Sequence, residues 1–373
     1  MAPRKHIVHL SSVHRAQDTR ILHRECRSLV EAGYDVTLIA NDDHDFELHG
    51  VQVRVLPKVG GGRILRMLKQ VRNLWRMAGE AHADLYHFHD PELIPVGLLL
   101  RLRRKPVIYD VHESVSKQIL HKYWIPGPLR PVVAGSYRLL ERAIAPLLTA
   151  FVAATPGVAS YFPARKTIVV QNYPVLSELM PADATPRERE LLAVYVGGVT
   201  EVRGVREMVA AMAYLPADSP ITLKIGGPVS PQSLLTELES APGSERTEFL
   251  GVLDRPAVAD LLQRAGVGLV ALHPEPNYLD SYPVKLFEYM AAGLPVVASN
   301  FPFWEQFVTD VGSGIMVDPL DPQAIADAIT LILSDPERAR EMGEVGFAAV
   351  RDRFNWDSEA RKLIALYRSI LGA

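Results

Sequence analysis

The residues best suited to chemistry lie between positions 279 and 299, in the run LDSYPVKLFEYMAAGLPVVAS. The acid Asp280 is followed, after seven residues, by a second acid, Glu288, and Lys285 stands between them. Carboxylates accept hydrogen bonds from hydroxyl groups, whereas a lysine and a helix N-terminus attract negative charge. This combination predicts a site for a polyhydroxylated anion.

The same run predicts a loop, a helix and a strand. Pro283 is placed where the first turn of a helix tolerates proline, and Gly293 where a helix commonly ends. Apolar residues that recur three and seven positions after Val284 give the helix one apolar face. The neighbouring stripe, with Lys285 and Glu288, is predicted to be exposed and to face a cleft. An ordinary amphipathic helix with a solvated Lys–Glu pair is the alternative.

The elements that position these residues follow a regular pattern. Short β-branched runs alternate with longer amphipathic stretches along the whole chain, which predicts parallel sheets covered by helices on both faces. Residues 173–190, rich in proline and polar side chains, predict a linker between two such units. Ligands of these sheets bind beyond the carboxyl ends of the strands. The expected strands cover residues 6–10, 36–40, 51–56, 85–88, 107–111, 151–154 and 168–170, then 193–196, 222–225, 248–250, 267–272, 296–299 and 314–317.

Composition restricts the class of protein. A chain of 373 residues exceeds one ordinary core, so two domains are expected. Its 48% hydrophobic and 22% charged residues are typical of water-soluble globular proteins. No apolar run is long enough for a transmembrane helix, and the N-terminal apolar run is too short for a signal peptide. The single cysteine, Cys26, cannot form an internal disulfide. We therefore expect a cytoplasmic protein, with Cys26 on the first helix.

Positive charge is concentrated in the first half of the chain. Residues 1–183 carry 24 Lys and Arg against 17 Asp and Glu, whereas residues 184–373 carry 16 against 26. Residues 63–76 form a basic amphipathic stretch, and residues 98–105 add further basic charge. Such a helix predicts either peripheral contact with an anionic membrane or an ordinary surface helix. No recognised module supports a nucleic-acid partner.

Polar residues follow three strands of the first half. His112 ends the strand at 107–111, where an imidazole can hydrogen-bond a hydroxyl group, although a structural histidine is the alternative. His89 and Asp90 end the preceding strand and are expected to line a cleft. Asp18 and Arg20, in the loop after the first strand, are expected either to contact a ligand or to form an internal ion pair that shapes the loop.

Metal binding is not expected. His87, His89 and Asp90 are close in sequence, but no further histidine or cysteine cluster completes a ligand set. An Asp-x-Asp pattern at residues 43–45 lies in a polar loop far in sequence from the acids at 280 and 288. The first strand–helix loop also lacks Gly-x-Gly-x-x-Gly, which argues against a dinucleotide-binding domain.

Two glycines follow the first strand of the second half. Gly197 and Gly198 permit a phosphate to approach the backbone closely. Arg203, six residues after Gly197, adds a positive charge as the next helix opens.

These features resemble glycosyltransferase family 4, a group of retaining, nucleotide-sugar-dependent enzymes with the GT-B fold. Its donor motif is Glu, seven residues and Glu, followed by an alanine-rich helix and a Gly-x-Pro-Val-Val strand; here Asp280 replaces the first Glu. The resemblance covers most of the chain and is most specific across residues 275–305. It implies an α/β fold with two doubly wound Rossmann-like domains that face a cleft. The implied domains are an acceptor-binding domain at 1–175, to which a terminal helix at 356–373 crosses back, and a donor-binding domain at 176–355.

The resemblance also implies a reaction. A hexosyl or N-acetylhexosaminyl group would move from a nucleoside diphosphate sugar, which we expect to be a UDP-sugar, to a glycan, lipid-linked or small-molecule acceptor. Arg203 and Lys285 would stabilise the leaving diphosphate, Glu288 would hold the ribose, and Asp280 and His112 would hold the sugar. The implied catalytic residues are His112, Arg203, Lys285 and Asp280, and the implied donor-binding residues are Gly197, Gly198, Arg203, Leu253, Asp280, Ser281, Tyr282, Lys285 and Glu288. The resemblance also makes Asp18, Arg20, His89 and Asp90 candidates for acceptor contact, with the internal ion pair as the alternative for Asp18 and Arg20.

The chain departs from the family pattern at Val199. The family commonly has an arginine there and a lysine where Arg203 stands, and these two cations grip the diphosphate. We expect Lys285 to supply the second charge, and Val199→Arg to be tolerated. Two other functions stay open: a nucleotide-sugar epimerase on the same fold, and a non-catalytic partner that binds a nucleotide-sugar.

Overall fold

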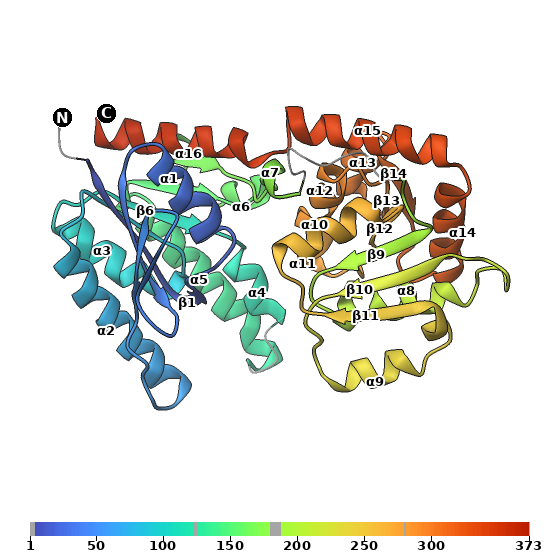
Figure 1. The fold of residues 1–373 in the computed structure, drawn as a ribbon. Coiled ribbons are helices and arrows are strands. Elements are labelled where there is room, and N and C mark those ends of the chain that lie inside the picture. Colours follow the sequence, from blue (N-terminus) through green and yellow to red (C-terminus); the bar gives the residue numbers. More distant parts are fainter. Residues whose placement is uncertain (1–3, 122–124, 180–187, 280, 373) are drawn as a thin grey trace. The chain divides into compact units, whose positions relative to one another are not determined.

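A computed structural model describes residues 4–121, 125–179, 188–279 and 281–372. The chain forms two compact units: residues 1–172 with 357–373, and residues 173–356. Each unit is built around one mainly parallel sheet (Figure 1).

Unit 1 has a sheet in the order β3-β4-β2-β1-β5-β6-β7-β8 among its described residues. All neighbours pair in parallel except β3 and β4 at one edge. Its strands are β1 (His6–Arg15), β2 (Asp35–Asn41), β3 (Phe46–Leu48), β4 (Val51–Val55), β5 (Leu85–Phe88), β6 (Val107–Val111), β7 (Ala150–Ala153) and β8 (Thr167–Val169). Its principal helices are η1 (Ile21–Cys26), α1 (Arg27–Glu31), α2 (Arg63–Ala81), α3 (Ile94–Leu102), α4 (Val115–His121), α5 (Arg130–Ile144), α6 (Pro156–Ala159) and α16 (Trp356–Leu371).

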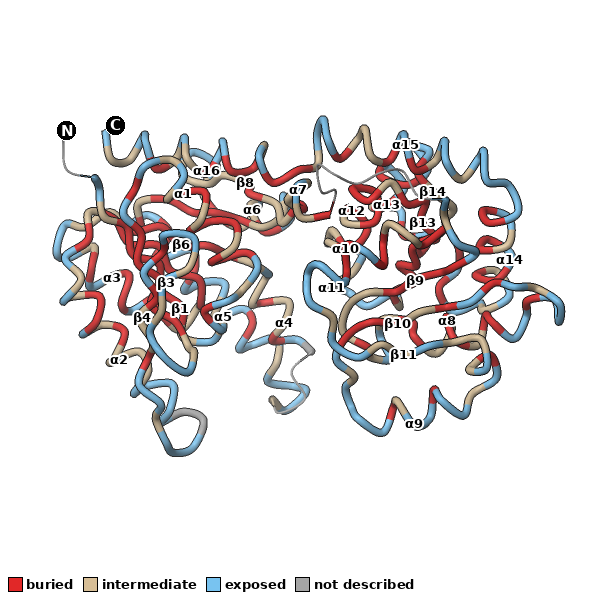
Figure 2. The backbone as a smooth tube through the Cα atoms, viewed as in Figure 1, coloured by how far each residue is buried: buried red, intermediate tan, exposed pale blue. Residues whose placement is uncertain are grey.

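The two faces of this sheet differ in chemistry, because alternate residues of a strand point to opposite faces. One face is apolar: Val8 and Leu10 of β1 pack in a single core with Tyr86 and Phe88 of β5. The residues between them are polar and equally buried, among them His9 on β1 and His87 on β5. The inner strands of the sheet are therefore buried, and Figure 2 shows them in red. Their buried polar residues form a layer on one face of the sheet.

Unit 2 has a parallel sheet in the order β11-β10-β9-β12-β13-β14 among its described residues. Separate apolar clusters cover its two faces, as the doubly wound arrangement requires. Its strands are β9 (Leu192–Val196), β10 (Thr222–Gly226), β11 (Thr247–Gly251), β12 (Val267–Val270), β13 (Val296–Ser299) and β14 (Gly314–Val317). Its principal helices are α7 (Leu176–Leu179), η5 (Glu201–Arg203), α8 (Val205–Met212), α9 (Ser233–Glu239), α10 (Arg255–Arg264), α11 (Pro276–Leu279), α12 (Val284–Ala291), α13 (Pro302–Val308), α14 (Pro322–Leu333) and α15 (Pro336–Asp352).

The predicted fold class is confirmed, with two doubly wound α/β units. The terminal helix α16 joins unit 1, where Tyr367 packs among buried residues of β1 and β5.

Cys26 lies buried at the end of η1. The edge strand β3 is absent from the expected strands, because its three residues are too short a run to show alternation. Among the helices of the described residues, none has the length and apolar character needed to cross a membrane.

Candidate functional site

Two cations of unit 2 converge on the glycine loop that follows β9. A Cβ atom built on Gly197 would lie 2.9 Å from Lys285 Nζ and 3.3 Å from Arg203 Nη1. Gly197 also has a φ of +145°, which side chains rarely adopt. A glycine at this point therefore leaves room for both cations.

Lys285 is buried, with 8% of its surface exposed, and the prediction of an exposed stripe is wrong for this residue. The glycine loop leaves space at the start of α12, and the lysine side chain occupies it. Its Nζ lies 3.8 Å from the ring centroid of Tyr195 and has no hydrogen-bond partner among the described residues. Burial, and then the charge of Arg203, hold the pKa of Lys285 well below its usual value. A buried amine that has no hydrogen-bond partner among the described residues and lies beside a second cation is suited to binding an anion.

Arg203 ends η5, and Gly204 opens α8 directly after it. Gly204 has a φ of +70°, and a Cβ there would collide with the carbonyl oxygen of Ala271. Burial alone would lower the pKa of Arg203, but the hydroxyl groups of Tyr195 and Tyr278 raise it. The arginine therefore stays charged beside the glycine loop.

Val199, where the family pattern is expected to have an arginine, is buried in the structure. Its side chain is 1% exposed and packs in the apolar core of unit 2, while its backbone pairs with residues 228–230. An arginine here would bury its guanidinium among aliphatic side chains, which argues against the expectation that Val199→Arg is tolerated.

Glu288 lies one helical turn after Lys285 and is held by an ion pair. Arg255 Nη1 is 2.9 Å from Glu288 Oε1, and Arg255 Nη2 is 2.8 Å from Glu178 Oε2. Burial opposes ionisation of Arg255, but Glu288 and Glu178 raise its pKa overall. Arg255 was not among the predicted site residues, because no pattern in the sequence relates it to Glu288.

The other predicted donor-binding residues, Ser281, Tyr282 and Leu253, lie in different environments. The backbone carbonyl of Ser281 accepts a hydrogen bond from Trp304 Nε1 at 2.9 Å. The ring of Tyr282 lies among aromatic rings, 4.8 Å from that of Phe303. The side chain of Leu253 would touch a Cβ built on Gly226, so it covers the backbone at the end of β10. Asp280 lies outside the described residues.

In unit 1, Asp90 binds the second half of β1. Its Oδ2 accepts hydrogen bonds from the Ser11 hydroxyl at 2.8 Å and from the backbone amides of Ser12 and Val13 at 2.6 and 3.2 Å. His14 lies at the other oxygen, 3.4 Å away. Asp90 thus shapes this polar edge, and its predicted contact with an acceptor stays a prediction.

Asp18 and Arg20 both bind other residues of unit 1. Asp18 Oδ1 accepts from the backbone amides of Arg20 and Ile21 at 2.9 and 3.0 Å, which fixes the start of η1. Arg20 is 4% exposed and binds Asp110 through Nε and Nη2, both at 3.0 Å, with Glu25 Oε1 also 3.0 Å from Nε. Arg20 therefore forms an internal ion pair, but with Asp110 and Glu25 rather than with Asp18. Its burial argues against direct contact of Arg20 with an acceptor.

His112 and His89 meet at the same carboxylate. Asp110 Oδ2 lies 3.0 Å from His112 Nε2 and 3.1 Å from His89 Nδ1. His89 is buried, whereas the side chain of His112 is 23% exposed. Burial opposes ionisation of Asp110, but Arg20 and His112 outweigh it and hold the Asp110 pKa well below its usual value. His112 is thus the exposed end of a buried polar network.

The buried part of this network was missed by sequence reasoning. His9 faces His87 in the register between β1 and β5, and Tyr367 bonds to both. One feature of the sequence could have indicated this network: polar residues recur at every second position of both strands, as at His9 and Ser11 and at His87 and His89. Two groups bring potential metal-ligating atoms within 4.8 Å of one another: His9, Glu25, His87 and His89, and His89, Asp110 and His112. The expectation of no metal stays a prediction.

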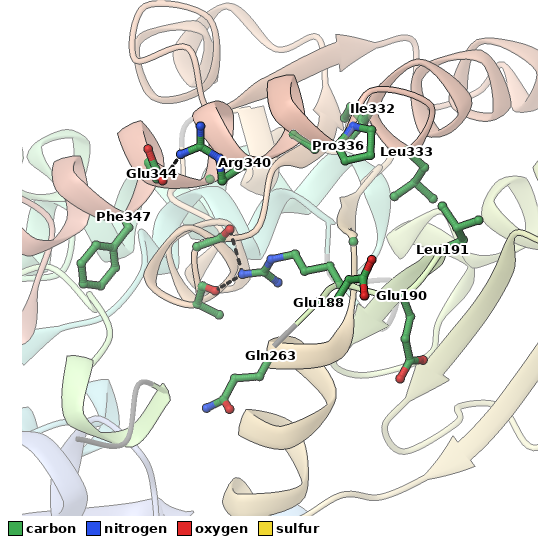
Figure 3. Close-up of a pocket in the computed structure, with 16 residues that line it drawn as sticks. Glu188, Glu190, Leu191, Gln263, Ile332, Leu333, Pro336, Arg340, Glu344 and Phe347 are labelled. Carbon is green, nitrogen blue, oxygen red and sulfur yellow. Dashed lines mark hydrogen bonds and ion pairs between the residues drawn. The ribbon is translucent and has the colours of Figure 1, made fainter. Parts of the chain in front are cut away.

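A pocket of about 820 Å³ in unit 2 lies away from these groups (Figure 3). Leu191 and Gly266 line it and directly precede β9 and β12. The pocket therefore lies at the amino end of β9, whereas the glycine loop follows the carboxyl end of that strand. Arg189, which also lines it, donates to four backbone carbonyls between residues 262 and 293. The pocket therefore offers no catalytic group comparable to Lys285.

Comparison with known proteins matches both halves of the chain to glycosyltransferases. Residues 177–348 match the family model for glycosyl transferases group 1, and residues 19–173 match that for the glycosyl transferase 4-like domain. The glycogen synthase of Mycobacterium tuberculosis is 25% identical over 348 residues, which cover 91% of this chain and 81% of the relative.

Solved structures share the fold. Sucrose-phosphate synthase from Thermosynechococcus elongatus is 23% identical, with a TM-score of 0.73 over 99% of this chain and 100% of that chain. The Anabaena protein Alr3699/HepE in complex with UDP-glucose is 16% identical, with a TM-score of 0.71 over 98% of this chain and 99% of that chain.

Proposed function

The chain belongs to the family 4-like glycosyltransferases with the GT-B fold, and from this premise we propose that it transfers a sugar from a nucleoside diphosphate sugar to an acceptor hydroxyl with retention of anomeric configuration. We propose that unit 2 binds the donor and unit 1 the acceptor. The nearest rivals are an epimerase on the same fold and a non-catalytic partner that binds a nucleotide-sugar.

The main support for this proposal is that the side chains of Lys285 and Arg203 both lie beside Gly197 in the glycine loop. When a sugar leaves a nucleoside diphosphate, negative charge grows on the diphosphate. Cations fixed in advance at that position stabilise the transition state more than the ground state. No side chain need act as a base, because a phosphate oxygen of the donor can take the proton of the acceptor hydroxyl.

The donor we propose is a UDP-sugar. The fold neighbour from Anabaena has been solved in complex with UDP-glucose, which supports this choice in kind. Glu288 would bind the ribose, and Ser281, Tyr282 and Leu253 would surround the rest of the nucleotide. In unit 1, His112 would bind a sugar hydroxyl, and His89 and Asp90 would support the acceptor.

Turnover with a panel of acceptors tests the function. A transferase consumes the donor only when an acceptor is present, and NMR of the product reports whether the anomeric configuration is kept. An epimerase consumes the donor alone, and a binding partner consumes none. Thermal-shift screening against UDP, GDP, ADP and their sugar conjugates identifies the base, because a ligand at 100 times its Kd stabilises by about 2.7 kcal/mol.

Glu288→Gln is expected to weaken binding of the free nucleotide by roughly 1.5–3 kcal/mol, because the ribose loses a charged hydrogen-bond acceptor. Isothermal titration with UDP measures the change. Glu178→Gln is the matched control, since Glu178 binds the same Arg255. Equal losses in both variants would mean that Glu288 acts only through Arg255.

Activity is expected to survive EDTA, because Lys285 and Arg203 supply the positive charge that a divalent metal supplies in other phosphate sites. Steady-state transfer is measured before and after chelation and dialysis. Loss of turnover that magnesium, manganese or zinc restores would contradict this expectation and direct attention to the histidine clusters of unit 1.

We also propose peripheral contact with an anionic membrane through the first turns of α2. Leu65 and Leu68 are 51% and 57% exposed, and the exposed residues Arg66, Lys69 and Arg72 accompany them. Apolar side chains beside basic ones suit insertion at a lipid headgroup region.

Replacing Arg66, Lys69 and Arg72 together by glutamine is expected to weaken binding to phosphatidylserine vesicles by about 1 kcal/mol per charge at low salt. Vesicle co-sedimentation at increasing ionic strength measures this. A triple glutamine variant of Arg338, Arg340 and Arg351 on α15 removes equal charge elsewhere and serves as control. If wild-type protein ignores such vesicles at low salt, a soluble acceptor is the better interpretation.

A further inference from the structure

His112 is the exposed end of a buried row of polar side chains in unit 1. The row runs from Tyr367 on α16 to His9, His89 and Asp110, with each contact between 3.0 and 3.1 Å. Asp110 Oδ2 then meets His112 Nε2 at 3.0 Å. These distances make every link a hydrogen bond, so each link needs one proton and one lone pair.

The direction of these hydrogen bonds is set at Asp110. Arg20 binds both oxygens of this buried carboxylate, which keeps it ionised and without a proton of its own. Any imidazole nitrogen that bonds to it must therefore carry the proton. This requirement applies to His89 Nδ1 and to His112 Nε2.

The buried histidines agree with that direction. Burial is the largest cause that lowers the pKa of both His89 and His9, so each is neutral and carries one proton. With its proton on Nδ1, His89 accepts at Nε2 from His9 Nδ1. His9 then accepts at Nε2 from the hydroxyl of Tyr367, whose oxygen accepts from His87 Nδ1 at 2.6 Å. One assignment of protons satisfies the whole row.

The same assignment fixes the outer face of His112. Its Nε2 lies 3.3 Å from His89 Nδ1, but that nitrogen already donates its proton to Asp110, so His112 Nε2 can only donate to the carboxylate. Neutral His112 then carries a lone pair on Nδ1, and no group among the described residues hydrogen-bonds to that atom.

We propose that Asp110 is the positioning residue of His112, and that it makes Nδ1 of His112 a hydrogen-bond acceptor which selects a hydroxyl group of the substrate rather than an anionic oxygen. A hydroxyl can donate to a lone pair, whereas a phosphate or carboxylate oxygen cannot. The identity of the substrate as a sugar rests on the proposed function. The tautomer of His112 does not, and it is measurable without substrate.

The test is the long-range ¹H–¹⁵N NMR spectrum of the ¹⁵N-histidine-labelled protein at mildly alkaline pH, with His112→Gln to assign the signals. We expect His112 with its proton on Nε2 in the wild type. A wild-type spectrum with the proton on Nδ1 overturns the proposal, even if Asp110 variants fail to fold.

Asp110→Asn supplies the second measurement. We expect a mixture of His112 tautomers and a roughly 10²-fold loss of kcat with a smaller change in KM, because the imidazole no longer presents a fixed acceptor. Asp35→Asn, an exposed acid of the same unit, is the control and should change neither. If the Asp110→Asn variant keeps His112 wholly in the Nε2–H form, Asp110 is not its determinant. If the wild type shows that form but transfers no sugar, the positioning stands and the proposed function fails.

Discussion

Lys285→Met is expected to lower kcat/KM for sugar transfer by roughly 10²–10³-fold, the usual loss when one preorganised donor at the developing charge is removed. Methionine keeps much of the volume beside Tyr195 but carries no charge. Lys224→Met on β10 is the matched control: it removes the same charge from a partly buried lysine of unit 2, one that is paired with Glu248 rather than directed at the glycine loop.

The same substitution is expected to raise thermal stability, which separates it from a folding defect. The lowered pKa of Lys285 means that the unfolded chain binds more protons than the folded one between that lowered pKa and the ordinary value. The free energy of unfolding of the wild type therefore rises with pH through this window. Lys285→Met lacks that contribution, so its advantage in Tm should shrink as pH rises.

Anions provide a further check on this assignment. Pyrophosphate or UDP should stabilise the wild type by binding the buried ammonium, and should stabilise the methionine variant less. Arg203→Met should show a similar loss of transfer. Near wild-type rates in both variants would mean that the diphosphate binds elsewhere.

Local patterns in the sequence were enough to select several of the proposed donor-binding residues. Gly197, Lys285 and Glu288 were selected because helix periodicity and strand ends are visible in the chain, and the structure brings Lys285 and Arg203 together at Gly197. The burial of Lys285 was not predictable, because it depends on how the N-terminus of α12 packs against the loop after β9. The buried side chain of Val199 follows from the bridge to Val229, which only tertiary structure creates.

The polar layer of unit 1 was predictable only in part. His89, Asp90 and His112 were selected because each follows a strand, and parallel strands bring such residues to one edge. Their supporting groups come from positions far apart in the chain: Arg20 from the first loop, and Tyr367 from the terminal helix. The periodicity of the sequence does not show either contact, because each one forms only when distant parts of the chain pack together.

Arg20→Met is expected to destabilise the protein by roughly 3–5 kcal/mol, the usual result of removing one partner from a buried ion pair. Asp110 would lose both of its bonds to the guanidinium, and Glu25 would lose its neighbouring charge. Arg15→Met is the control, because the side chain of Arg15 is 75% exposed and water screens its pairs with Asp42 and Asp43 from that side. Urea unfolding measures the difference.

The pH dependence of this loss distinguishes an ion pair from a packing defect. The depressed pKa of Asp110 contributes stability above its unfolded value, and that stability disappears as pH falls through the folded pKa. Burial is the largest cause that raises the pKa of Glu25, so its effect on stability has the opposite sign. The folded protein favours protonated Glu25, and ionisation of this carboxyl group lowers the free energy of unfolding as pH rises. Without Arg20 both carboxyl groups would resist ionisation, so the deficit of the methionine variant should be greatest near neutral pH and shrink on acidification. A deficit that stays constant with pH would mean that Arg20 acts through packing alone.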